Sequence, residues 1–179
     1  MPAHPRARVV KIVVAGLPDS GKTTLVNTLS ELSVIKTERF SEREGRNTTV
    51  AMDFGVIAID ESRSVHLYGL PGQERFSFMM DVLNHGVDGL IYLSQASQTD
   101  AARDRECFDQ ARKTFSVPLV VGVTKVDCVD DPRSAYSLVR SRLGLEPYHL
   151  VLTCDARDRD EAKTLLVALF NEMIAARHR

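Results

Sequence analysis

The sequence predicts an α/β fold built on a doubly wound, mostly parallel six-stranded sheet, with one antiparallel edge strand and helices on both faces. Its 179 residues fit one compact domain. Short, continuously apolar runs alternate with segments of helical periodicity, without repeats or low-complexity tracts. This alternation is typical of parallel sheets that are buried on both faces. We therefore expect a single domain over residues 1–179, with residues 1–7 as a flexible N-terminus.

The first half of the chain begins with a buried strand, Val9 to Ala15, that runs directly into a glycine. A helix is predicted from Lys22, because apolar residues follow at helical spacing: Leu25, Val26, Leu29 and Leu32. Residues 34–48 are polar and lack a clear period, which predicts a long mobile loop. The strands VAMDFGVIAID and SVHLYGL flank the short turn 60–63 and form a hairpin, the source of the antiparallel strand. A helix to about Asn84 follows.

The second half continues with the strand GLIYLS, a helix over residues 99–115 and the strand VPLVVGVT. A capping aspartate and a first-turn proline, Asp131 and Pro132, open the next helix. The last strand is predicted in YHLVLTC, and Asp158 with Glu161 resembles a capping box. The final helix is expected to bury Leu165, Leu166, Leu169, Phe170, Met173 and Ile174.

Composition disfavours several classes of function. The chain is 44% hydrophobic and 26% charged with a formal net charge of -1, so it has no general electrostatic attraction to nucleic acid. No apolar run approaches the roughly 18 residues that span a bilayer, and the N-terminus lacks a signal-peptide pattern. We therefore expect no integral membrane segment and a cytoplasmic location. The three cysteines lack CxxC spacing, which disfavours a zinc site or a disulfide framework.

The stretch GLPDSGKT matches the pattern G-x-x-x-x-G-K-[ST] and lies between a predicted strand and a predicted helix. Such a loop directs backbone N–H groups toward phosphate oxygens at a helix N-terminus. Lys22 is expected to reach the outer phosphates, and the Thr23 hydroxyl to bind Mg²⁺. The candidate phosphate-binding residues are Gly16, Asp19, Ser20, Gly21, Lys22, Thr23 and Thr24.

A second motif indicates which base is bound. At the end of an apolar strand, Thr124, Lys125 and Asp127 form T-K-x-D, a variant of the N-K-x-D element of GTP-binding proteins. The Asp127 carboxylate can accept hydrogen bonds from the N1–H and amino groups of guanine, whereas adenine presents an acceptor there. Lys125 can lie along the base, and Thr124 can support the loop. In TCDAR, Asp155 and Ala156 lie where such proteins place S-A-K, so the Ala156 N–H would face the guanine oxygen.

Together these motifs resemble the Ras-like small GTPases over about residues 8–175, with the five elements in the expected order and spacing. More narrowly, KIVVAG with GKTT, TTVAMDFG, LYGLPGQERF and CDARD resemble a bacterial subgroup related to the gliding-motility switch MglA and the actinobacterial conservon GTPases. The resemblance implies a P-loop NTPase fold with GTP/GDP and Mg²⁺ as cofactors. It also implies a molecular switch that is often paired with a roadblock/LC7-type regulator.

The resemblance assigns roles in two switch segments as well. Thr49 corresponds to the threonine that binds Mg²⁺ and senses the terminal phosphate, with Thr48 as the alternative, and Asp53 follows in the T-x-x-x-D-F pattern. Gly72 corresponds to the glycine whose amide meets the terminal phosphate, and Gln73 to the residue that orients the attacking water. The catalytic candidates are Gln73, Lys22 and Thr49, and the metal-binding candidates are Thr23 and Thr49.

Two departures from the family pattern concern turnover. Gly69 stands where the family usually has an aspartate that supports Mg²⁺ through water, so we expect weaker Mg²⁺ binding with guanine binding retained. On this basis Gly69→Asp is expected to raise Mg²⁺ affinity or leave it unchanged while stiffening the loop. Pro18 replaces a glycine and removes one amide donor. A stabilising arginine would come from a partner or, in cis, from Arg39, Arg43 or Arg46.

We therefore expect a small GTP-binding protein that acts as a GDP/GTP switch, with slow Mg²⁺-dependent hydrolysis assisted by a partner. The alternative is a non-hydrolysing guanine-nucleotide-binding scaffold, which Gly69 favours and which Gln73 and Thr23 disfavour. A P-loop kinase acting on a metabolite would have no use for T-K-x-D. A last group of residues belongs either to the core or to a partner-binding surface: Phe76, Phe78, Met79 and Met80.

Overall fold

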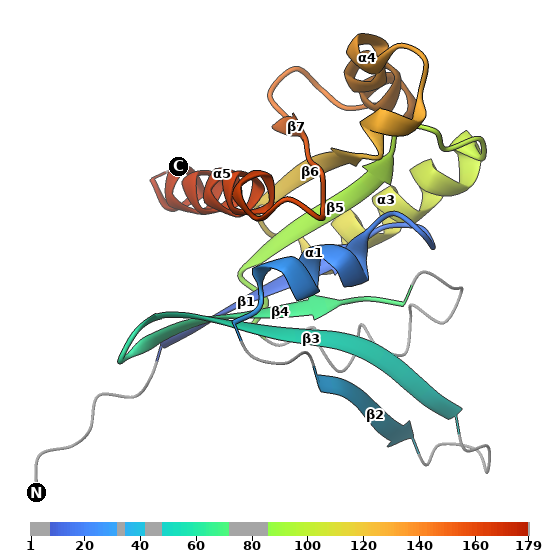
Figure 1. Cartoon of the computed structure of the whole chain (residues 1–179). Helices are drawn as coiled ribbons and strands as arrows, with labels where there is room; N and C mark the ends of the chain where they lie inside the picture. Colours follow the sequence, from blue (N-terminus) through green and yellow to red (C-terminus); the bar gives the residue numbers. More distant parts are fainter. Residues whose placement is uncertain (1–7, 32–34, 42–47, 72–85, 179) are drawn as a thin grey trace, which may run out of the picture.

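The computed structural model describes residues 8–31, 35–41, 48–71 and 86–178, with the backbone alone described for 35–41 and 48–51. Within these residues, one seven-stranded sheet has the strand order β2-β3-β4-β1-β5-β6-β7 (Figure 1). The strands are β1 (Arg8–Ala15), β2 (Ile35–Ser41), β3 (Thr48–Asp60), β4 (Arg63–Gly69), β5 (Gly89–Gln95), β6 (Leu119–Thr124) and β7 (Val151–Thr153).

Parallel pairing dominates the sheet. β1 pairs in parallel with β4 and β5, β5 with β6, and β6 with β7, whereas β3 is antiparallel to both of its neighbours. The predicted α/β fold is confirmed, including the hairpin between β3 and β4. β7 is shorter than predicted, because the N–H of His149 closes a turn on the carbonyl of Glu146 just before it.

The seventh strand corrects the prediction of a long loop over residues 34–48. β2 runs antiparallel to β3, from Ile35 opposite Phe54 to Ser41 opposite Thr48. The outer edge of β3 offers a row of N–H and C=O groups, and a polar, charged composition is common in the edge strand that pairs with such a row. Polarity therefore did not distinguish an edge strand from a loop. Residues 42–47 lie outside the described residues, as does the helix expected to end near Asn84.

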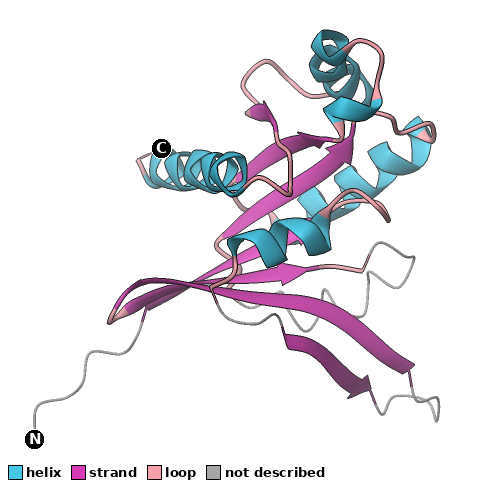
Figure 2. Ribbon diagram, in the orientation of Figure 1, coloured by secondary structure: helices cyan, strands magenta, loops and turns pink. Residues whose placement is uncertain are grey.

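Helices cover both faces of the sheet (Figure 2). They are α1 (Lys22–Leu29), α3 (Ala101–Phe115), α4 (Pro132–Leu143) and α5 (Arg159–Arg177), with a short 3₁₀ helix, η1 (Val126–Cys128), after β6. Ile12 and Val14 of β1 pack into the apolar cluster with α1 and α5, whereas Val13 and Ala15 pack into the cluster with α3 and α4. No helix of the described residues is both long enough and apolar enough to cross a membrane.

The start of α5 differs in detail from the predicted capping box. The Asp158 carboxylate caps the helix as expected. The Glu161 carboxylate, however, accepts the N–H of Asp155 at 2.7 Å, while the N–H of Asp158 donates to the carbonyl of Asp155. The loop before α5 is therefore fastened to the first turn of the helix.

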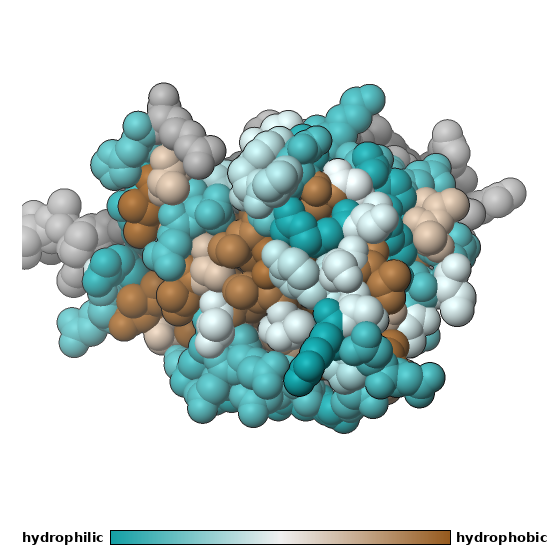
Figure 3. All heavy atoms as spheres, turned by 90° about the horizontal axis from the view of Figure 1, so that it is seen from above, coloured by the Kyte–Doolittle hydropathy of each residue, from teal (hydrophilic) through white to brown (hydrophobic). Residues whose placement is uncertain are grey.

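The outer surface of α5 retains some apolar side chains. Ile174, which was predicted to be buried, is 56% exposed, and Val167 is 55% exposed. The buried stripe runs through residues 162, 165, 166, 169 and 173, and Ile174 lies beside it. Viewed from above, apolar residues form patches between hydrophilic ones (Figure 3).

Candidate nucleotide-binding site

The loop between β1 and α1 has the backbone conformation of a tight anion-binding turn. Gly16 and Gly21 adopt φ angles of 145° and 96°, and Asp19 adopts 64°. A Cβ atom on Gly16 would lie 2.3 Å from the carbonyl oxygen of Leu93 in β5. Only glycine fits at position 16, which gives the first glycine of the motif a steric reason.

The N-terminus of α1 leaves donors available at this loop. Gly21 is the N-cap residue and no side chain caps the helix, so the first-turn amides, including those of Thr23 and Thr24, have no partner within the helix. Lys22 is 7% exposed, and its Nζ donates to the carbonyl of Leu17 at 2.7 Å. Burial lowers the pKa of Lys22 to about 8. A buried ammonium beside uncapped amides suits an anionic ligand.

Three segments that are far apart in the sequence meet at Gly21. A Cβ atom on Gly21 would lie 3.3 Å from Cβ of Ala156 and 3.9 Å from Cγ2 of Thr124. The Thr124 hydroxyl donates to the carbonyl of Ser20 at 2.9 Å, and the Thr28 hydroxyl donates to the carbonyl of Ala156 at 2.8 Å. The carboxyl ends of the parallel strands β1, β6 and β7 bring these segments to one edge of the sheet.

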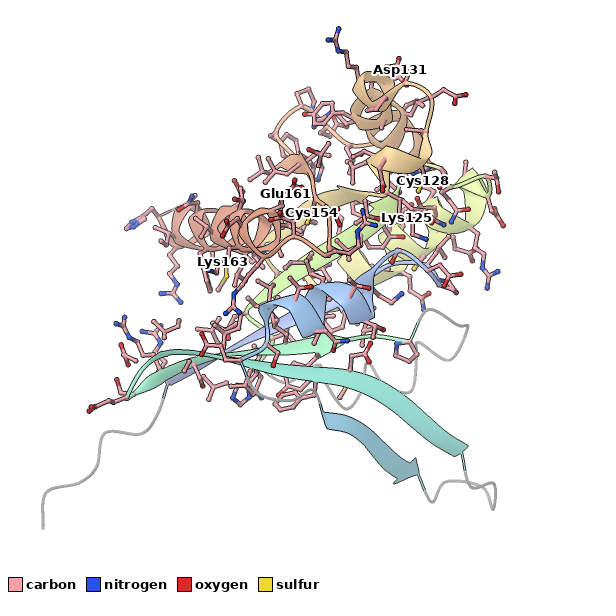
Figure 4. All side chains as sticks on the ribbon, in the orientation of Figure 1. Lys125, Cys128, Asp131, Cys154, Glu161 and Lys163 are labelled. Atoms are coloured by element: carbon pink, nitrogen blue, oxygen red, sulfur yellow. The ribbon has the colours of Figure 1, made fainter. Side chains whose placement is uncertain are left out.

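The predicted base-recognition residues at this edge differ in burial: Asp127 is exposed, Lys125 and Asp155 are half-buried, and Thr124 and Ala156 are buried. Lys125, which Figure 4 labels, has a left-handed φ of 55° and joins β6 to η1. Asp127 and Asp155 both contact Arg157, whose Nη2 lies 2.9 Å from Asp127 Oδ2 and 2.8 Å from Asp155 Oδ2. Hydrogen bonds from Arg157 hold the pKa of both carboxyls below the usual range. Arg157 could not be predicted as a site residue from the sequence, because its contact with Asp127 exists only in the folded chain.

A further carboxylate lies beside the phosphate loop. The Thr23 hydroxyl donates to Asp53 Oδ2 at 2.5 Å. Asp53 of β3 pairs with Gly69 of β4, and a Cβ atom on Gly69 would lie 3.0 Å from Cβ and 3.3 Å from Oδ2 of Asp53. The neighbouring strand therefore places a carboxylate where the side chain of residue 69 would begin.

The two predicted metal-binding threonines belong to different elements, Thr23 to α1 and Thr49 to β3. Asp53, four residues after Thr49 on the same strand, contacts Thr23, so Thr49 lies about 13 Å further along β3. Several other candidates lie outside the described residues: Gly72, Gln73, Phe76, Phe78, Met79, Met80, Arg43 and Arg46.

The oxygen atoms beside the loop fit a magnesium ion. Mg²⁺ prefers oxygen ligands and is usually held by one or two protein groups together with phosphate oxygens and water. The Thr23 hydroxyl and the Asp53 carboxylate form such a pair. In the part of the chain that is described, no group of three or more His, Cys, Asp or Glu side chains could hold a metal alone. The site therefore fits an ion that is shared with a bound phosphate.

Comparison with known proteins gives matches over most of the chain. A family model for the elongation factor Tu GTP binding domain matches residues 7–173. The uncharacterized protein MJ1339 of Methanocaldococcus jannaschii is 30% identical over 121 residues, which are 68% of this chain and 73% of the relative. The family match includes the phosphate loop, the T-K-x-D element and the loop before α5. The chain thus belongs to the family of elongation factor Tu GTP-binding domains and is a P-loop GTP-binding protein.

Proposed function

We propose that this protein is a GDP/GTP molecular switch with slow, Mg²⁺-dependent GTP hydrolysis, formed by one G domain over residues 1–179. The meeting of three segments at Gly21 carries the proposal, because it joins an uncapped helix N-terminus to both parts of a base site. The motifs support a place in the MglA-like subgroup. A cytoplasmic location is part of the proposal.

The nucleotide would lie along the carboxyl edge of the sheet. Its phosphate oxygens would accept hydrogen bonds from the amides of residues 19–24 and from Lys22, which would then gain anionic partners. Asp127 would accept the N1–H and amino groups of guanine, with Lys125 along the base. The Ala156 N–H would donate to the guanine oxygen, and Asp155 would hold this loop in place.

Thr23 and Asp53 would hold Mg²⁺ beside the outer phosphates. The ion neutralises negative charge on the transferring phosphoryl group. Thr49 is proposed to join them in the GTP-bound state, which requires β2 and β3 to move relative to α1. Gly72 would donate its amide to the terminal phosphate, and Gln73 would orient the attacking water.

A partner is proposed to assist turnover. The stabilising arginine would come from that partner, or from Arg39, Arg43 or Arg46 in cis. The resemblance supports a roadblock/LC7-type regulator and an effector that reads the two switch segments. Nucleic acid is not proposed as a partner, because the net charge is -1.

Calorimetric titration with GDP, GTP and ATP, with and without Mg²⁺, tests nucleotide binding. We expect micromolar or tighter binding of GDP and GTP, and binding of ATP weaker by at least about 100-fold, because Asp127 opposes adenine. Equal affinity for ATP would exclude the guanine assignment.

Two variants of the β3–β4 hairpin test whether Asp53 helps to bind Mg²⁺. Asp53→Asn should raise the Mg²⁺ concentration required for tight GTP binding by about tenfold. Glu61→Gln, at the exposed tip of the same hairpin, removes the same charge and should have no effect. An unchanged Mg²⁺ requirement in Asp53→Asn would remove Asp53 from the metal site.

A non-hydrolysing scaffold is the second candidate, because Asp53 contacts Thr23 and Thr49 lies four residues further along β3. Single-turnover phosphate release, with and without a candidate regulator, separates the two functions. A rate above that of Gln73→Ala supports the switch, and a rate equal to it supports the scaffold.

A further inference from the structure

Arg157 joins two elements at the base site through its charged end. Its side chain is 68% exposed, and its guanidinium contacts Asp127 of η1 and Asp155 after β7. An exposed arginine is ordinarily solvated and contributes little through a single ion pair. Two carboxylates that share one guanidinium define its position much more narrowly.

Asp155 fixes the guanidinium. Arg157 Nε lies 2.9 Å from Asp155 Oδ1 and 3.2 Å from Oδ2, and Nη2 lies 2.8 Å from Oδ2. The Arg157 backbone N–H also donates to Oδ1 at 2.9 Å. The N–H of Asp155 in turn donates to the Glu161 carboxylate at 2.7 Å. A chain of contacts therefore runs from the first turn of α5 to the guanidinium, whose planar fork a lysine could not reproduce.

The same guanidinium reaches the base-recognition carboxylate. Nη2 donates to Asp127 Oδ2 at 2.9 Å, across 30 residues of sequence. A carboxylate offers about four acceptor positions, so Asp127 can keep this bond and still accept two donors from guanine. Its other contacts are local, from its own backbone N–H and from the Cys128 thiol, which lies 3.6 Å from Oδ1. Among the described residues, Arg157 therefore makes the contact from another element that restricts rotation of the carboxylate.

We propose that Arg157 is a positioning residue for guanine recognition, which turns the Asp127 carboxylate toward the N1–H and 2-amino groups of the base. The inference rests on the proposed guanine nucleotide site. The 2-amino group depends most on this orientation, because it needs the second carboxylate oxygen at a fixed angle.

Titrations with GDP and inosine diphosphate, which lacks the 2-amino group, test the role. Arg157→Ala should weaken GDP binding about fivefold, with a smaller loss for inosine diphosphate, so that the preference for GDP falls. Arg159→Ala is the control, because it removes an equal charge two residues away, where the arginine faces Glu31. Arg157→Lys keeps the charge without the fork and should restore less than half of the lost preference.

A double-mutant cycle isolates the contact with the carboxylate. In an Asp127→Ala background, Arg157→Ala should not change the preference further. Equal losses for the two nucleotides, or tighter GDP binding by Arg157→Ala, would overturn the positioning role. A wild-type protein that does not prefer GDP over ATP would instead contradict the proposed function.

Discussion

The glycine at position 69 determines where the side chain of Asp53, its partner on the adjacent strand, can lie. Glycine there leaves room for the Asp53 carboxylate, which bonds to Thr23 of the phosphate loop. From the sequence, the lack of an aspartate at position 69 predicted weaker Mg²⁺ binding. The structure instead provides a carboxylate from the adjacent strand, so a second one at position 69 would face a like charge at close range.

This changes the expected effect of Gly69→Asp. The variant should lower the free energy of unfolding of the nucleotide-free protein by about 2 kcal/mol, through crowding and charge repulsion against Asp53. Gly69→Ala, which adds only the crowding, should cost about half as much. Urea unfolding at low Mg²⁺ measures both. If Gly69→Asp had wild-type stability and bound Mg²⁺ more tightly, the prediction made from the sequence would hold and the predicted repulsion from Asp53 would be wrong.

Hydrogen bonds join α1 to β3 at the C-terminal end of α1, remote from the phosphate loop. The N–H of Val56 donates to Ser30 Oγ at 3.2 Å, and the N–H of Glu31 donates to the carbonyl of Val56 at 3.0 Å. The Glu31 carboxylate accepts the N–H of Ala58 at 3.1 Å. A displacement of the whole of β3 relative to α1 would have to break these bonds.

Gly55 lets α1 approach β3 this closely. A Cβ atom there would lie 2.9 Å from Val26 Cγ1 and 3.1 Å from Ser30 Cβ. Gly55→Ala should therefore lower the free energy of unfolding by about 1 to 3 kcal/mol, measured by urea denaturation. Ala58→Ser, at an exposed position of the same strand, should have little effect. Wild-type stability in Gly55→Ala would show that this helix shifts freely on the sheet.

Sequence reasoning succeeded where the chemistry is local. The phosphate loop, the hairpin turn and the cap at Asp131 each depend on a few consecutive residues, and all are present. The pairing of Asp53 with Gly69 could not be predicted in this way. In a regular hairpin that pairs Asp60 with Arg63, Asp53 would lie opposite residue 70. The irregularity between Ala58 and Asp60 shifts the register by one.

For the whole molecule, Lys22 links nucleotide binding to stability. Burial lowers the pKa of Lys22 to about 8 from 10.5. Between these values the unfolded chain binds more protons than the nucleotide-free folded protein, so this group makes the free energy of unfolding rise with pH over that window. Below pH 8 the folded protein keeps a buried charge that disfavours folding, and phosphate would remove much of that penalty.

Lys22→Met should therefore have two opposite effects. It should raise the stability of the nucleotide-free protein at pH 7 by about 1 kcal/mol or more, because an apolar side chain replaces a buried ammonium. It should also abolish the rise in Tm that GDP and Mg²⁺ cause. For the wild-type protein this rise should be about 10 °C when the GDP concentration is 1,000 times its Kd. Thermal unfolding measures both effects, with the exposed Lys163→Met as control. A lower Tm without nucleotide would show that the bond to Leu17 outweighs the burial.

The buried ammonium of Lys22 also bears on the lifetime of the protein in the cell. In the proposed switch, every exchange of GDP for GTP would pass through the nucleotide-free form, in which this charge would lack its anionic partner. When opening and reclosing are fast relative to cleavage, degradation follows the population of opened molecules. The abundance of the protein should then follow the guanine nucleotide supply, and a partner that holds the nucleotide-free form would also protect it from proteases.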